Sequence, residues 1–104
     1  MAIPGLKFLP NKDMMELITK VVCTYLKIPR NDLLIKRRFR YLVHARHVIM
    51  YLARQKTSYT LKEIGNTLGG YDHTSVLNAV KSINNLLFSD PAIRIEVEKI
   101  SEEL

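Results

Sequence analysis

The feature that most constrains the fold of this 104-residue chain is Gly69-Gly70, which separates two helical patterns. The first pattern begins with Thr60-Leu-Lys-Glu63, a capping box in which the Thr60 hydroxyl accepts from the Glu63 amide and Glu63 reaches back. The glycines tolerate the left-handed backbone that ends a helix. A second helix is expected from Asp72, its cap, to about Leu87. Two helices joined by a tight glycine turn predict a helix-turn-helix.

The rest of the chain shows only helical periodicity, and no stretch alternates cleanly enough to predict a strand. We expect helices from about Lys12 to Leu26 and from about Tyr41 to Gln55. A short helical turn from Asn31 to Ile35, capped by Asn31, and a last helix beginning at Asp90-Pro91 complete the set. The predicted class is all-α, a helix-turn-helix bundle of five to six helices. Residues 1–11 are expected to be an N-terminal extension and residues 12–104 the folded domain.

Spacings of three and four residues also predict which side chains face the core. In the first helix they are Met14, Leu17, Ile18, Val21, Val22 and Tyr25. In the long central helix they are Ala45, Val48, Ile49 and Leu52. In the helix after the glycine turn they are Val76, Val80, Ile83 and Leu87.

Charge is distributed unevenly along the chain. Its net value is +6, but residues 27–56 contain nine bases and one acid, whereas five acids oppose two bases from Asp90 onward. A molecule with one basic region and one acidic end is typical of proteins that meet a polyanion on one side. Charge alone does not decide the matter, because many small domains are equally basic without binding nucleic acid.

The outward face of the helix expected over residues 72–87 has an unusual chemistry. Thr74, Asn78, Lys81 and Asn85 lie opposite the apolar stripe, and this face contains no carboxylate. Short amide and hydroxyl groups can donate and accept at base edges, and their small size lets a helix lie deep in a groove. In a helix-turn-helix the second helix enters the major groove amino end first.

The residues at the start of that helix would therefore lie nearest to the bases. Asp72 can accept from a cytosine amino group, His73 can contact a thymine methyl or a base acceptor, and Thr74 and Ser75 can reach base edges or phosphate. The alternatives are that Asp72 only caps the helix and that His73 is simply an exposed residue. A catalytic triad is excluded, because its members converge from separate segments. We expect no enzymatic activity.

A basic loop, Lys36-Arg37-Arg38-Phe39-Arg40, lies between two predicted helices. Phe39 is expected to pack inward and anchor the loop rather than stack on a base. Arginines on such a loop can enter a narrow minor groove, or they can contact phosphates and set affinity without reading sequence. The alternative is a solvated basic loop with no partner.

Other classes of site and location find little support. Cys23 cannot form an internal disulfide and is expected to be buried. No apolar run approaches a membrane span, and the N-terminus lacks the order of a signal peptide, so we expect a cytoplasmic protein with no membrane partner. His44 and His47 share a helix face without a third ligand, so no metal is expected. No cofactor and no small-molecule substrate are expected either.

Together these motifs resemble the C-terminal DNA-binding domain of DnaA, the bacterial chromosomal replication initiator. The resemblance covers roughly Lys12 to Ile100 and includes the basic loop. It is carried by Ile64-Gly65 and by Leu68-Gly69-Gly70-Tyr71-Asp72-His73-Thr74-Ser75-Val76-Leu77. It implies a Trp-repressor-like helical domain that binds double-stranded DNA at a short asymmetric element, the DnaA box.

The resemblance also implies roles for individual residues. Asp72, His73, Thr74 and Ser75 match positions that face major-groove bases, Arg38 matches a minor-groove arginine, and Arg46 matches an arginine that contacts the DNA backbone. The full set of predicted DNA-binding residues is Arg37, Arg38, Arg40, Arg46, Tyr71, Asp72, His73, Thr74, Ser75, Asn78 and Lys81.

The sequence departs from the family pattern at three places. Tyr71 stands where the family usually has arginine, and His44-Ala45-Arg46-His47 stands where it has Arg-Pro-Arg-Gln. No G-x-x-x-x-G-K-[ST] loop of an ATPase is present. We therefore expect a free-standing DNA-binding domain in replication initiation or its regulation, with any partner protein unknown. The alternative is a protein-interaction module or transcriptional regulator that keeps the fold without binding DnaA boxes.

Overall fold

The computed structural model describes residues 9–35 and 38–104, and within them the chain forms six helices and no strand. The helices are α1 (Asn11–Leu26), α2 (Arg30–Leu34), α3 (Arg40–Lys56), α4 (Leu61–Thr67), α5 (His73–Ser89) and α6 (Pro91–Glu102). The predicted all-α class is confirmed.

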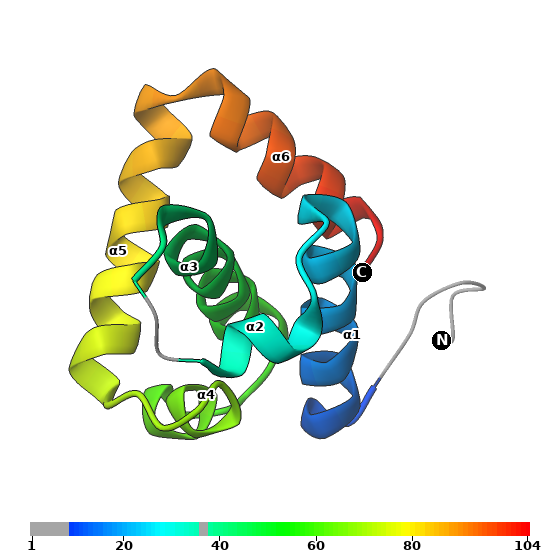
Figure 1. Cartoon of the computed structure of the whole chain (residues 1–104), viewed down its shortest axis with the longest axis vertical. Coiled ribbons are helices and arrows are strands. Elements are labelled where there is room, and N and C mark those ends of the chain that lie inside the picture. Colours follow the sequence, from blue (N-terminus) through cyan, green and yellow to red (C-terminus); the bar gives the residue numbers. More distant parts are fainter. Residues whose placement is uncertain (1–8, 36–37) are drawn as a thin grey trace, which may run out of the picture.

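Helix α3 lies at the centre of the molecule and the other helices surround it (Figure 1). The predicted inner face of this helix is confirmed, because Ala45, Val48, Ile49 and Leu52 are completely buried. Burial also extends beyond that face to other sides of the helix. A helix that packs against neighbours on several sides buries residues beyond one stripe, so a single stripe underestimates its buried surface.

The buried side of helix α1 includes Met15, Ile18 and Val22. The prediction that Tyr25 belongs to this face is wrong, because 42% of its surface is exposed. Cys23 is buried as predicted, and that burial raises the pKa of its thiol. The helix ends at Leu26, and the next residue, Lys27, takes the left-handed conformation with φ 57°.

Helix α2 begins one residue earlier than predicted, and Asn31 is not its cap. Pro29 occupies the N-cap position with φ −59° and ψ 135°, and no side chain caps this helix. The Pro29 carbonyl accepts from the Asp32 amide at 3.0 Å. Proline supplies this extended cap geometry without a side-chain acceptor, because its ring fixes φ.

The helix-turn-helix consists of α4, the glycine turn and α5. The capping box is present as predicted: the Thr60 amide donates to Glu63 Oε1 at 2.9 Å, and the Glu63 amide donates to Thr60 Oγ1 at 3.1 Å. Gly69 and Gly70 have φ of 107° and 91°. A residue with a Cβ atom rarely adopts such angles, which explains the two glycines.

A third glycine, Gly65, holds the turn against α4. Its carbonyl accepts from the amides of Leu68 at 3.2 Å, Gly70 at 3.0 Å and Tyr71 at 3.1 Å. A Cβ atom added to Gly65 would lie 1.9 Å from the carbonyl oxygen of Tyr71. The two backbones are therefore in direct contact, and this contact fixes where α5 begins.

Helices α5 and α6 begin at the aspartates predicted to cap them. Asp72 Oδ1 accepts from the Ser75 amide at 2.8 Å, and Asp90 Oδ1 accepts from the Ala92 and Ile93 amides at 3.0 and 3.4 Å. Helix α6 then runs from the end of α5 back to α1 (Figure 1). No helix in the described ranges is long and apolar enough to cross a membrane.

Candidate nucleic-acid interface

The amino end of α5 is accessible on the surface of the molecule. Asp72, His73, Thr74 and Ser75 are all exposed, and the imidazole of His73 is not part of the core. Hydrogen bonds from Ser75 hold the pKa of Asp72 below its ordinary value. Asp72 is therefore an ionised acceptor at neutral pH, so it can cap the helix and still offer a lone pair to a donor on a partner.

The outward face of α5 matches the prediction. Thr74, Asn78, Lys81 and Asn85 are exposed. On the inner face Val76 and Ile83 are fully buried, whereas Val80 and Leu87 are only partly buried. Ala79 is also in the core, with 1% of its surface exposed, and was not assigned to it from the sequence.

A groove of about 1000 Å³ runs between α3 and α5. None of the described residues that line it carries a carboxylate. Its lining consists of Arg38, Arg40, Val43, His44, Arg46, His47, Met50, Tyr71, Ser75, Asn78, Ser82 and Leu86. A concave strip with cations and short polar groups is suited to a chain of phosphates, because clefts of one charge sign concentrate the field.

The structure brings most of the predicted residues to one side of the molecule. Six of them line the groove: Arg38, Arg40, Arg46, Tyr71, Ser75 and Asn78. Four others lie on the surface of α5 or at its start outside that lining: Asp72, His73, Thr74 and Lys81. The predicted contact at Arg37 lies outside the described residues.

Arg46 is placed differently from an arginine that faces solvent. Only 4% of its surface is exposed, its Nε donates to the Leu33 carbonyl at 3.0 Å, and its Nη2 donates to the Ile35 carbonyl. Its guanidinium carbon lies 5.8 Å from the centroid of the Tyr71 ring. Arg46 thus joins the end of α2 to the residue before the Asp72 cap, and a direct contact with DNA stays a prediction.

The prediction that Phe39 packs inward is wrong. Its side chain is 49% exposed and stacks on Tyr41, with ring centroids 6.0 Å apart. Phe39 is instead the N-cap residue of α3, and its carbonyl accepts from the Leu42 and Val43 amides at 3.0 and 2.9 Å. Leu42, at 2% exposure, takes the inward position that was assigned to the aromatic ring.

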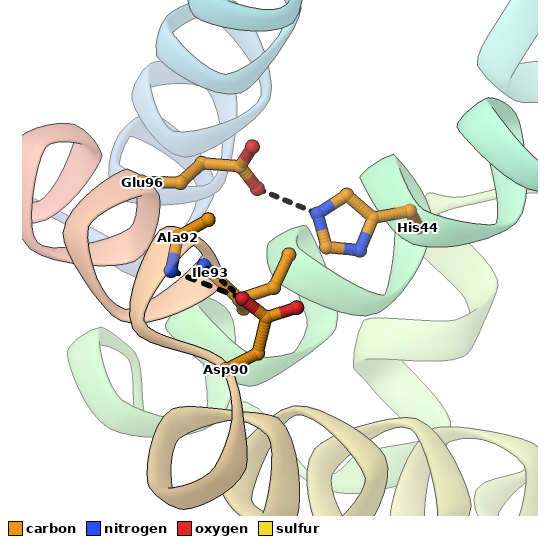
Figure 2. A network of polar contacts seen from close by, with 5 residues as sticks. All are labelled: His44, Asp90, Ala92, Ile93 and Glu96. Atoms are coloured by element: carbon orange, nitrogen blue, oxygen red, sulfur yellow. Dashed lines mark hydrogen bonds and ion pairs between the residues drawn. The ribbon is translucent and has the colours of Figure 1, made fainter.

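Two histidines of α3 line the groove and were considered from the sequence only as metal ligands. His44 Nε2 lies 2.5 Å from Glu96 Oε1, a contact that ties α6 to α3 (Figure 2). Burial, together with His44 and Arg46, lowers the pKa of His47. Arg40, His44 and His47 recur at spacings of four and three, so helical periodicity could have identified this polar stripe.

No metal site is formed in the part of the chain that the structure describes, where no group of three potential ligands occurs. His44 and His47 contribute polar groups to the lining of the groove.

Comparison with known proteins finds matches over the same region. The family described as bacterial dnaA protein helix-turn-helix matches residues 15–83. "Chromosomal replication initiator protein DnaA" of Rhodopseudomonas palustris (strain BisA53) is 42% identical over 95 residues, which cover 91% of this chain and 20% of that protein. The protein of the same name from Enterococcus faecalis (strain ATCC 700802 / V583) is 39% identical over 105 residues, covering 99% and 24%. The chain thus spans about a fifth to a quarter of the length of these relatives.

Proposed function

Because this chain belongs to the family of the bacterial DnaA helix-turn-helix domain, we propose that it binds double-stranded DNA in chromosomal replication initiation or its regulation. The observation that carries the proposal is the accessible amino end of α5 beside a cationic groove whose described lining residues include no carboxylate. The proposed role is recognition, and the binding unit is the domain of residues 12–104.

In the proposed complex, the amino end of α5 enters the major groove of a DnaA-box-like element. His73 and Thr74 then lie closest to the base edges, and the ionised Asp72 faces an amino group. The outward face of the next turns contains short polar side chains, one lysine and no carboxylate, which supports this placement, since a long acidic side chain on that face would meet the DNA backbone. Asn78 and Lys81 follow along the same exposed side of α5.

Arg38 enters the adjacent minor groove in this proposal. It is exposed, and it shares the groove between α3 and α5 with Ser75. A phosphate strand crossing that groove would pass Arg40 and the neutral Tyr71. Tyr71 can donate a hydroxyl hydrogen bond to phosphate but carries no charge. Its contact would therefore not add to the salt dependence of binding as an arginine contact would.

Selection of preferred duplexes from a random pool tests the proposal directly. We expect the selected duplexes to share one short asymmetric element, and we expect His73→Ala to lose the preference for it. Asn84→Ala is the matched control, because Asn84 is exposed on a similar side of α5 but about three turns from the tip. A pool that yields no common element would refute sequence-specific binding and favour a protein-interaction module.

A further inference from the structure

Two aromatic side chains at the amino end of α3 are about half exposed. Phe39 is 49% exposed and Tyr41 is 52% exposed. Their rings are 6.0 Å apart between centroids, with 13° between the ring planes. Exposed apolar residues are ordinary when scattered, but two stacked rings form one continuous apolar surface that a partner can cover.

Two cations lie beside this aromatic pair along the chain, because Arg38 precedes Phe39 and Arg40 lies between Phe39 and Tyr41. Arg38 and Arg40 are exposed, and both line the groove that continues to α5. The backbone beneath the rings is fixed, because the Phe39 carbonyl accepts from the Leu42 and Val43 amides and Leu42 is buried. Phe39 and Tyr41 therefore lie on backbone that the start of the central helix holds in place, so little backbone conformational entropy would be lost on binding.

We propose that Phe39 and Tyr41 form an apolar contact with duplex DNA, packing on the sugars and base edges of the minor groove next to Arg38. This inference rests on the proposed function and adds a contact to it. Apolar side chains that enter a minor groove beside arginines pack against bases and partly unstack them. The flanking guanidiniums attract the phosphates, and the rings cover the apolar sugar surface between those phosphates.

Single-stranded DNA fits these observations less well. Proteins that bind single strands distribute several aromatic rings along a basic groove, so that successive bases can stack. The described lining of the groove contains one aromatic residue, Tyr71, and the guanidinium of Arg46 lies over its ring. The exposed pair is thus placed for one local contact with a duplex rather than for a row of stacked bases.

The experiment compares Phe39→Ala, Tyr41→Ala and their combination with the wild-type protein. Dissociation constants are measured on the selected duplex, on a random duplex and on single strands, each over a series of salt concentrations. Phe88→Ala is the matched control, because Phe88 is 84% exposed but lies in the last turn of α5, far along that helix from its tip. Urea unfolding reports whether each variant is folded.

We expect the double variant to bind the selected duplex about 5- to 50-fold more weakly, within the range found when aromatic rings that contact bases are removed. The salt dependence should stay unchanged, because an apolar contact releases no counterions. Phe88→Ala should bind as the wild type does. If the alanine pair does not fold, Phe39→Leu and Tyr41→Leu keep an apolar side chain and should show smaller losses in the same direction.

Wild-type affinity of all folded variants for the selected duplex would overturn this inference while leaving the proposed function intact. A loss confined to single strands would overturn it as well, and would identify the pair as a stacking platform for unpaired bases. A wild-type protein that binds no DNA would instead refute the proposed function, and the aromatic contact would fall with it.

Discussion

Gly65→Ala is expected to destabilise the protein, although alanine is the better helix former. The added Cβ would lie 1.9 Å from the Tyr71 carbonyl oxygen, 2.8 Å from the Tyr71 carbonyl carbon and 3.3 Å from Val76 Cγ2. Ordinary contacts of a Cβ begin at 3.4 Å, so the Tyr71 carbonyl has to retreat by about 1.5 Å. The two nearest atoms belong to the backbone of Tyr71, so rotation of a side chain cannot relieve the clash.

The magnitude follows from what that retreat disrupts. The amides of Gly70 and Tyr71 donate to the Gly65 carbonyl, and each bond contributes about 1 kcal/mol. Overpacking adds about 1–3 kcal/mol of strain, and the better helix propensity of alanine offsets about 1 kcal/mol. The free energy of unfolding should therefore fall by about 2–4 kcal/mol, taking these terms together.

Urea titrations followed by far-ultraviolet circular dichroism measure this change. Asn66→Ala is the control, because Asn66 is the next residue of α4 and is exposed, and it should stay within about 0.5 kcal/mol of the wild type. Since Tyr71 directly precedes the Asp72 cap, the folded fraction of Gly65→Ala should also bind the selected duplex more weakly. A Gly65→Ala protein as stable as the Asn66→Ala control would refute the reasoning.

Three further predictions concern single side chains. His73→Ala should cost about 1–3 kcal/mol on the selected duplex and leave binding to random duplex nearly intact, as measured by competition titration; equal losses on both would contradict base contact. Arg38→Ala should weaken binding and reduce the salt slope by about one, and an unchanged slope would exclude a phosphate-neutralising role. The pKa of His47 is lowered in the folded state, so the unfolded chain binds more protons below pH 6.5 and stability should fall as the pH drops through that value. His47→Gln should reduce this loss in urea titrations at about pH 7.5 and 5.5, and an equal loss in both proteins would show that other groups cause it.

The features predicted correctly from the sequence are those set by local hydrogen bonds. The Thr60 capping box, the caps at Asp72 and Asp90, and the positive φ of Gly69 each depend on residues no more than three positions apart. Such devices act in the same way wherever the helix lies in the fold, because their partners are fixed by the chain itself. Helix boundaries therefore followed closely from the sequence.

The errors occur where distant parts of the chain decide the outcome. Phe39 was expected to point inward because its flanking arginines are charged, but the burial of Leu42 in the core leaves the aromatic ring outside. The contact of His44 with Glu96 joins residues 52 positions apart, and no local sequence spacing predicts it. The start of α2 is a local exception: Asn31 was expected to cap α2 from its residue type, whereas Pro29 occupies that place by its backbone angles.

Arg46 shows how the fold connects the two proposed regions of DNA contact. Its Nε and Nη2 donate to the carbonyls of Leu33 and Ile35, just before the basic loop, and its guanidinium lies over the ring of Tyr71, just before the cap of α5. A lysine would keep the charge but could not donate in this planar arrangement while covering the ring. The Arg46 side chain therefore constrains the spacing between Arg38 and His73, together with the packing of α3 on α5 and the glycine turn. A duplex that engages both regions has to match that spacing, so contacts in the major and the minor groove should strengthen each other instead of acting independently.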